Sequence, residues 1–183
     1  FYIPASLTEI GDDAFGNCSS LHDVRVSPEN TSFVFEDGAL YNKDKTVLYW
    51  VSFDVEDFIV PNTVKQFGTV FAKHETLRTV RFEEGSEITS IPSYAFDGCS
   101  SLVSVDLPEK AEAIGEGSFR QCGSLVKVTN TKNVSWIGRD AFRLCQKLES
   151  FHFSDKLTYI GDYAFAYCNF TEIDLSECTS LLL

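Results

Sequence analysis

This 183-residue sequence has six cysteines and three histidines, residue types that can form disulfides, bind a metal or act in catalysis. Five of the cysteines recur at one position of a repeated pattern: Cys18, Cys99, Cys122, Cys145 and Cys168. Equivalent residues of stacked repeats point the same way, and parallel Cβ vectors give poor disulfide geometry. We therefore predict a ladder of small buried thiols. Cys178 lies outside the pattern and is expected to be the most accessible thiol.

The histidines do not form a recognisable active site. His74 takes the ladder position between Cys18 and Cys99, where the sequence offers no four converging ligands for a zinc ion. His22 and His152 lie several copies apart, whereas proton transfer requires contacts of ~2.6–3.2 Å. Motifs such as H-E-x-x-H and G-x-S-x-G do not occur. We predict no metal, no cofactor and no enzymatic activity.

The ladder residues belong to a unit that occurs six times. It reads L-x-x-I-G-x-x-A-F-x-x-C-x-x-L-x-x-V-x-L, and its Phe residues are spaced by 23 to 25 residues, with one step of 56. These residues are Phe15, Phe71, Phe96, Phe119, Phe142 and Phe165. One such unit has too few apolar positions to fold alone, whereas stacked copies bury a continuous core.

The pattern within a unit also predicts its local structure. Residues 102–107 alternate with a period of two, which predicts a short strand with Leu102, Val105 and Leu107 pointing inward. The A-F-x-x-C segment is too short for a stable α-helix and predicts a single 3₁₀ or helical turn. Gly after Ile indicates a chain reversal that needs positive φ or close approach. Stacking then places the strands side by side in a parallel sheet.

Two motifs carry a resemblance to a known family. LTEIGDDAFGNCSSLHDVRV (residues 7–26) and LTYIGDYAFAYC (residues 157–168) resemble the BspA-type leucine-rich repeat family, and the likeness extends over nearly the whole chain. It implies a right-handed repeat solenoid with a parallel sheet on one face. It also implies a cell-surface or secreted, adhesin-like protein that binds an extracellular protein or glycan. Unlike the commoner leucine-rich consensus, this unit has its Cys before the strand.

We expect a single array over residues 1–183, with six copies of about 23 residues and one insertion. The insertion, residues 27–57, contains strand-like segments at 33–36, 39–41 and 47–51 and predicts a projecting β-hairpin or meander. The spacing around Leu181 matches the start of a further copy. Solenoids need polar caps at their ends, and neither end of this sequence has one. We therefore expect the chain to be a window of a longer array.

The charge balance excludes some partners. Lys and Arg number 15 against 27 Asp and Glu, a net charge of −12, which disfavours nucleic acids and anionic membrane surfaces. No apolar run approaches the ~18 residues of a membrane-spanning helix.

The outward positions of the predicted strands form two columns, which are the candidate binding residues. The first column is Asp23, Thr79, Ser104, Lys127, Ser150 and Glu172. The second is Arg25, Arg81, Asp106, Thr129, His152 and Asp174. This face has Arg25 and Arg81 in the first two copies and two acidic residues in the last, so it could select a partner by charge complementarity. The alternative, that the face is only solvated, stays open.

A second candidate surface is aromatic. The insertion contains Tyr41, Tyr49, Trp50 and Phe53, and exposed aromatics are typical interface anchors. We favour the alternative that they pack the insertion onto the solenoid. Four glycosylation sequons, at Asn17, Asn30, Asn133 and Asn169, matter only in a glycosylating secretory pathway.

Together these features predict a non-catalytic binding module for a protein or glycan ligand. Two alternatives remain: a structural spacer, and an accessory array attached to a catalytic domain outside this chain.

Overall fold

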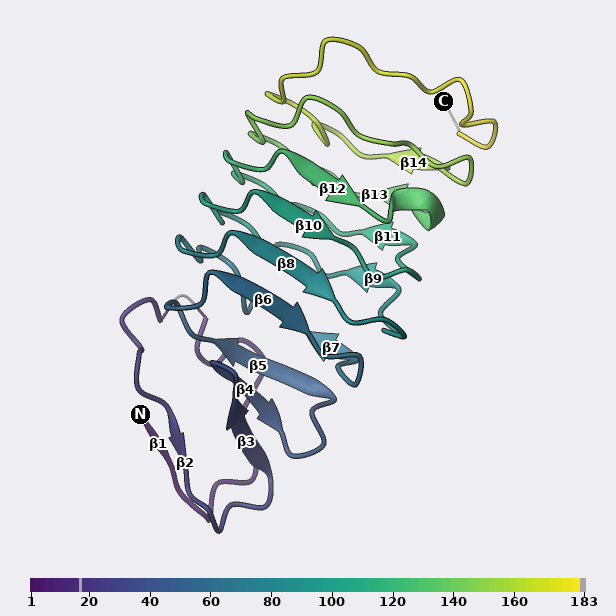
Figure 1. The fold of residues 1–183 in the computed structure, drawn as a ribbon. Coiled ribbons are helices and arrows are strands. Elements are labelled where there is room, and N and C mark those ends of the chain that lie inside the picture. Colours follow the sequence, from purple (N-terminus) through teal and green to yellow (C-terminus); the bar gives the residue numbers. More distant parts are fainter. Residues whose placement is uncertain (17, 182–183) are drawn as a thin grey trace.

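The protein, described here by a computed structural model of residues 1–16 and 18–181, is a parallel β-solenoid (Figure 1). The predicted leucine-rich repeat solenoid is confirmed. Its main sheet consists of strands β6 (Asp57–Val60), β8 (Thr79–Phe82), β10 (Ser104–Asp106) and β12 (Lys127–Thr129). All neighbouring strands in this sheet are parallel.

The main sheet follows the alternation read from the sequence. Leu102, Val105 and Leu107 are buried as predicted, and Val105 lies in register with Val80 on one side and Val128 on the other. Period-two alternation therefore directs one apolar column inward and leaves the intervening residues at the surface.

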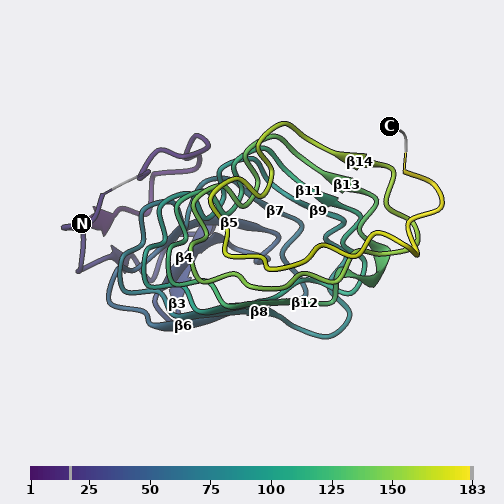
Figure 2. The ribbon, with the colours of Figure 1, turned by 90° about the horizontal axis from the view of Figure 1, so that it is seen from above.

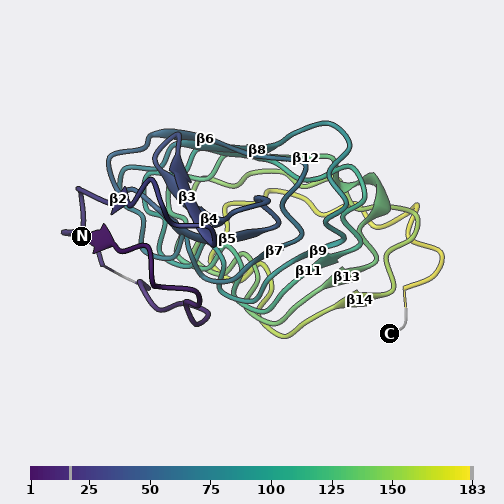
Figure 3. The same cartoon turned by 90° about the horizontal axis from the view of Figure 1, so that it is seen from below.

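A second parallel sheet was not predicted. It consists of β9 (Ser90–Ile91), β11 (Ala113–Ile114), β13 (Trp136–Ile137) and β14 (Tyr159–Ile160). Viewed along the solenoid, its strands lie on a different flank from those of the main sheet (Figures 2 and 3). Each of these strands has two residues, only one of which points inward, so the sequence has no alternation from which to recognise it.

The glycines that follow these isoleucines are required by close approach between copies. A Cβ atom at Gly115 or Gly138 would lie 2.7 Å from backbone of the preceding copy, and one at Gly161 only 2.4 Å. None of these three glycines has positive φ. Of the two explanations offered by the sequence, close approach is correct here.

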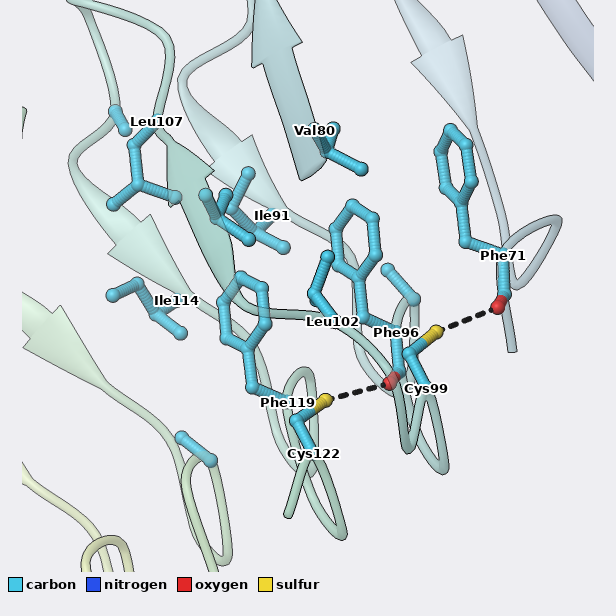
Figure 4. Packing of buried hydrophobic residues seen from close by; sticks show 14 of the residues in the cluster. Phe71, Val80, Ile91, Phe96, Cys99, Leu102, Leu107, Ile114, Phe119 and Cys122 are labelled. Atoms are coloured by element: carbon cyan, nitrogen blue, oxygen red, sulfur yellow. Dashed lines mark hydrogen bonds between the residues drawn. The ribbon is translucent and has the colours of Figure 1, made fainter. Parts of the chain in front are cut away.

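The core is organised around a column of stacked Phe rings (Figure 4). Phe96 and Phe119 are fully buried, with ring centroids 5.1 Å apart and planes within 3°. The same stacking joins Phe71 to Phe96, at 4.9 Å, and Phe119 to Phe142, at 5.1 Å. Phe165 extends the column by a further 5.1 Å.

The cysteine ladder runs beside the Phe column. The Cys99 thiol donates a hydrogen bond to the Phe71 carbonyl oxygen at 2.9 Å, and Cys122 donates to the Phe96 carbonyl at 3.1 Å (Figure 4). Cys145 makes the equivalent bond, and within the copy the Cys99 amide donates to the Phe96 carbonyl at 3.1 Å, as in a 3₁₀ turn. Each of these thiols therefore links its own turn to the preceding copy.

Two cysteines depart from the prediction. Cys18 is exposed, because the first copy does not stack on the Phe column. Cys178, expected to be the most accessible thiol, is 8% exposed and donates to the Ser154 carbonyl oxygen. Of the ladder cysteines, Cys18 is therefore the most accessible, and Cys168 is half-buried.

The predicted strands of the insertion are confirmed as β3 (Phe33–Glu36), β4 (Ala39–Asn42) and β5 (Val47–Val51), an antiparallel meander. The meander does not simply project from the solenoid. Strand β5 pairs in parallel with β7 (Gln66–Phe67), and β6 then enters the main sheet. The insertion thus contributes part of the solenoid wall and an additional turn.

The first copy forms a separate small unit. Strands β1 (Tyr2–Ile3) and β2 (Arg25–Val26) pair only with each other among the described residues. Their core contains Ile3 and Val24 and is closed by Phe33 and Trp50 from the meander. The meander therefore separates two cores and packs against both.

Replacement of Gly138 by Ala tests the close approach between copies. We expect Gly138→Ala to lower the free energy of unfolding by about 1–3 kcal/mol, because the new Cβ overlaps backbone that cannot move independently. The matched control is Gly123→Ala, where a Cβ meets nothing within 4 Å and the expected change is below about 0.5 kcal/mol. Urea unfolding of both variants measures the difference, and equal stabilities would contradict the packing argument.

Thiol labelling tests the ladder. Burial raises the pKa of Cys99 to about 12 and also raises the pKa of Cys122, and only the thiolate reacts. We expect a disulfide reagent to label Cys18 first in the native protein and all six cysteines after denaturation without reductant. Cys18→Ser removes the fast phase. Labelling of Cys178 as fast as Cys18, or fewer than six thiols after denaturation, would show the assignment to be wrong.

Candidate binding surface

The outward face of the main sheet carries two columns of side chains. Register pairs align Asp57, Thr79, Ser104 and Lys127 in the first column. They align Ile59, Arg81, Asp106 and Thr129 in the second. Six of the twelve predicted column residues are therefore brought together on one sheet, and β6 adds two that were not predicted.

Hydrogen bonds between copies arrange part of this face. The Thr79 hydroxyl donates to the Asp57 carboxylate at 2.5 Å, and the Thr129 hydroxyl donates to Asp106. Among the described residues, Arg81 and Lys127 have no carboxylate oxygen within 4.0 Å. The hydroxyls thus hold the carboxylates in place, while the two cations are available to a partner.

Asp23 and Arg25 do not continue these columns. They belong to the first copy, where Arg25 pairs with Tyr2, so Arg25 does not lie beside Arg81 as the repeat count had indicated. The Arg25 guanidinium instead donates to the Asp23 carboxylate at 3.0 and 2.9 Å, which lowers the pKa of Asp23. The cause is the extra turn: β6 occupies the place that β2 was expected to take.

The last predicted column residues lie beyond β12, where the described chain has no further main-sheet strand. Ser150, Glu172 and Asp174 line a cavity of about 520 Å³ between the last two turns, and His152 is exposed nearby in sequence. Hydrogen bonds from Ser176 lower the pKa of Asp174. These residues form a separate acidic end of the surface and do not extend the ordered columns.

The insertion aromatics mainly pack the fold together, as favoured. Tyr41, Trp50 and Phe53 are buried, with 3%, 2% and 8% of their surfaces exposed. Tyr49 is half-buried and contacts the Phe33 ring edge-on, with 5.7 Å between centroids. They therefore provide no set of exposed anchors.

The sequence reading missed β6 as a repeat strand. Phe58, Val60 and Pro61 match Val105, Leu107 and Pro108 one for one, with the inward apolar residues at the same spacing. The signal was present, but this copy lacks the A-F-x-x-C segment, so the residues after the predicted insertion (27–57) were not recognised as the strand of a further copy.

The second sheet exposes an aromatic pair that was also missed. Trp136 and Tyr159 are in register on β13 and β14, with 48% and 43% of their surfaces exposed and ring centroids 4.7 Å apart. Because these strands were not predicted, nothing in the sequence reading brought the two rings together.

His74 is accommodated in the core, next to the insertion. Its ring stacks on Phe53 at 4.5 Å, and Nε2–H donates to the Ser52 carbonyl oxygen at 2.8 Å. Burial lowers the pKa of His74, so the neutral ring is the folded form. It replaces the ladder thiol by bonding to the insertion.

Neither a metal-type cluster nor a spanning helix occurs in the part of the chain that the structure describes. There, no three His, Cys, Asp or Glu side chains are grouped to hold a metal ion. In the same residues, no helix has the length and apolar character needed to cross a membrane.

The sequons differ in accessibility. The Asn30 side chain is buried and donates to the carbonyl oxygens of Pro4 and Leu7, while Asn169 is exposed. Asn133 is half-buried and donates to the Glu109 carbonyl. Asn17 lies outside the described residues.

This repeat geometry agrees with a known sequence family. The model of the BspA type leucine-rich repeat region matches residues 1–43 and 69–181, with six copies. The chain belongs to this family. The unmatched internal segment, residues 44–68, contains β5, β6 and β7, where the meander joins the solenoid.

Solved structures with this fold include several bacterial leucine-rich repeat proteins. The pneumococcal vaccine antigen PcpA is 27% identical over 85% of this chain and 38% of its own, with a TM-score of 0.71. A leucine-rich repeat protein from Eubacterium ventriosum is 24% identical over 94% of this chain and 59% of its own, with a TM-score of 0.59.

A leucine rich cell surface protein from Faecalibacterium prausnitzii is 21% identical over 74% of this chain and 40% of its own, with a TM-score of 0.60. At these identities the second and third likenesses show the fold alone. This chain spans between 38% and 59% of the length of the three structures. No curated protein matches it.

The burial of neutral His74 predicts an acid-sensitive stability. Its folded pKa is below the unfolded value near 6.5, so the unfolded state binds the proton first as the pH falls. Below about pH 6.5 the free energy of unfolding should therefore fall, by up to about 1.4 kcal/mol per pH unit from this residue.

Urea unfolding between pH 7 and 5 measures this effect. His74→Gln should be less stable at pH 7 but lose less stability on acidification than the parent protein. The matched control, His152→Gln, changes an exposed histidine and should keep the parent's pH profile. If His74→Gln kept that profile too, the burial argument would be wrong.

Proposed function

We propose that this chain is a non-catalytic protein-binding module, and that it binds its partner through the outward face of the main sheet. The carrying observation is the arrangement of Arg81 and Lys127, two cations without carboxylate partners among the described residues, beside the fixed carboxylates of Asp57 and Asp106. A rigid face with both signs of charge favours a partner with the complementary pattern.

A shallow cavity supports this assignment. It has a volume of about 480 Å³ and lies where the chain enters the strands of the main sheet. The charged residues of its lining are Glu56, Glu75, Arg78 and Lys147. A partner on the sheet can therefore also place a side chain in this cavity, and the charges continue the mixed pattern of the columns.

We further propose a cell-surface or secreted location and an adhesin-like role. Family membership supports this, together with the likeness to a pneumococcal vaccine antigen and to a protein described as a cell surface protein. The partner is then an extracellular protein, and a glycan is the alternative ligand.

The spacer and accessory-array hypotheses do not require this face to bind a partner. Either role requires only that the face be solvated, whereas binding requires particular charges at particular positions. A charge reversal at one column position therefore separates binding from both alternatives.

Reversal of Arg81 tests the proposed face. The protein is applied to immobilised extracellular-matrix proteins and to a glycan array, and its affinity for any ligand found is measured by surface plasmon resonance. We expect Arg81→Glu to weaken protein binding by about tenfold or more, and high salt to weaken it as well.

Lys43→Glu is the matched control, because it makes the same charge change at an exposed turn of the meander. It should leave affinity unchanged. The proposal is rejected if no matrix protein binds at physiological salt, or if both variants bind as the parent protein does. Binding to glycans alone would favour the alternative ligand.

A further inference from the structure

The interruption of the stack creates a second cavity, of about 360 Å³, which shares Glu75 and Thr76 with the cavity beside the main sheet. Three separate segments line it: the first copy, the turn between β5 and β6, and the turn that contains His74. Its lining residues are Ser19, His22, Phe53, Asp54, Lys73, Glu75 and Thr76. Cavities of about 300–1,000 Å³ are the usual size of small-molecule sites.

The walls of this cavity are held by defined contacts. His22 Nδ1 lies 3.2 Å from both oxygens of the Asp54 carboxylate, which joins the first copy to the meander turn. Phe53 is fixed by its stack on buried His74, and the Thr76 hydroxyl donates to the Phe53 carbonyl oxygen. These contacts fix part of the wall on either side of the broken ladder, and the exposed side chains of Lys73 and Glu75 complete the lining.

Besides His22, the lining has one lysine and two carboxylates. Asp54 is engaged by His22, which leaves the Lys73 ammonium and the Glu75 carboxylate. Within the described chain neither of these two groups has an oppositely charged partner within 4.0 Å. One cation and one anion in the same cavity are thus available to a ligand.

We propose that this cavity binds a small dipolar ligand, namely a free α-amino acid. Lys73 receives its carboxylate, Glu75 receives its ammonium group, and its side chain lies toward Phe53. A purely anionic ligand would face two carboxylates, and a purely cationic one would face Lys73. Hydrogen bonds to charged groups are stronger than neutral ones, so both ends of the ligand contribute.

Calorimetric titration of the full chain with L-leucine tests the proposal. N-acetyl-L-leucine lacks the ammonium charge and L-leucinamide lacks the carboxylate. We expect saturable binding of L-leucine and at least about tenfold weaker binding of both capped compounds. Equal binding of a capped compound, or no saturation by L-leucine up to about 10 mM, would overturn the proposal.

Two variants locate the site. Lys73→Met and Glu75→Gln should each weaken L-leucine binding at least about tenfold. Lys132→Met and Glu109→Gln remove charges at exposed positions outside the cavity and should have no effect. Unchanged binding by both cavity variants overturns the assignment. If a cavity variant unfolds, the capped compounds still decide the question on the parent protein.

This inference goes beyond the proposed function, and the two fail separately. L-leucine titration involves no matrix protein, and Arg81 does not line the cavity. Loss of one binding activity therefore leaves the other to be judged by its own experiment.

Discussion

The distance between neighbouring copies is the constraint on which this structure depends. Parallel strands lie about 4.8 Å apart, and the Phe rings of successive copies stack at 4.9 to 5.1 Å. Strand pairing and ring stacking therefore require the same separation. Gly138 permits that separation where two backbones come closest, and Cys122 uses it to reach the Phe96 carbonyl. A bulkier residue at either position would disturb the strands as well as its own site.

The same constraint explains what happens where the repetition fails. The meander replaces the A-F-x-x-C segment of one copy, so Cys18 has no Phe column beside it and becomes exposed. At the next ladder position His74 stands in place of a thiol and reaches across to Ser52, directly after β5. Where the ladder is interrupted, a buried polar contact thus replaces a ladder hydrogen bond. The cavity beside Phe53 lies next to this interruption.

A feature of this fold could be predicted from the sequence when several residues of the repeat carry its pattern. The inward column of the main sheet could be predicted because Leu102, Val105 and Leu107 alternate, and six copies repeat the pattern. The second sheet could not, because each of its strands has a single inward residue. The prediction that Arg25 lies in the second column was wrong, because the copy that contains β6 has neither the Phe nor the Cys by which copies were counted. Phe58 and Val60 nevertheless carry the strand pattern of that copy.

A solenoid also separates the residues that hold it together from those that can bind. Inward residues and glycines are fixed by stacking, so outward positions such as Arg81 and Lys127 can vary without cost to the core. Stacking nevertheless determines where those outward residues lie, because each strand is in register with the next. The chain therefore has an ordered surface whose chemistry is free to change from copy to copy. The irregular junction is the exception: its cavity depends on His22 and Asp54 meeting across a break, so its chemistry cannot be read from the repeat alone.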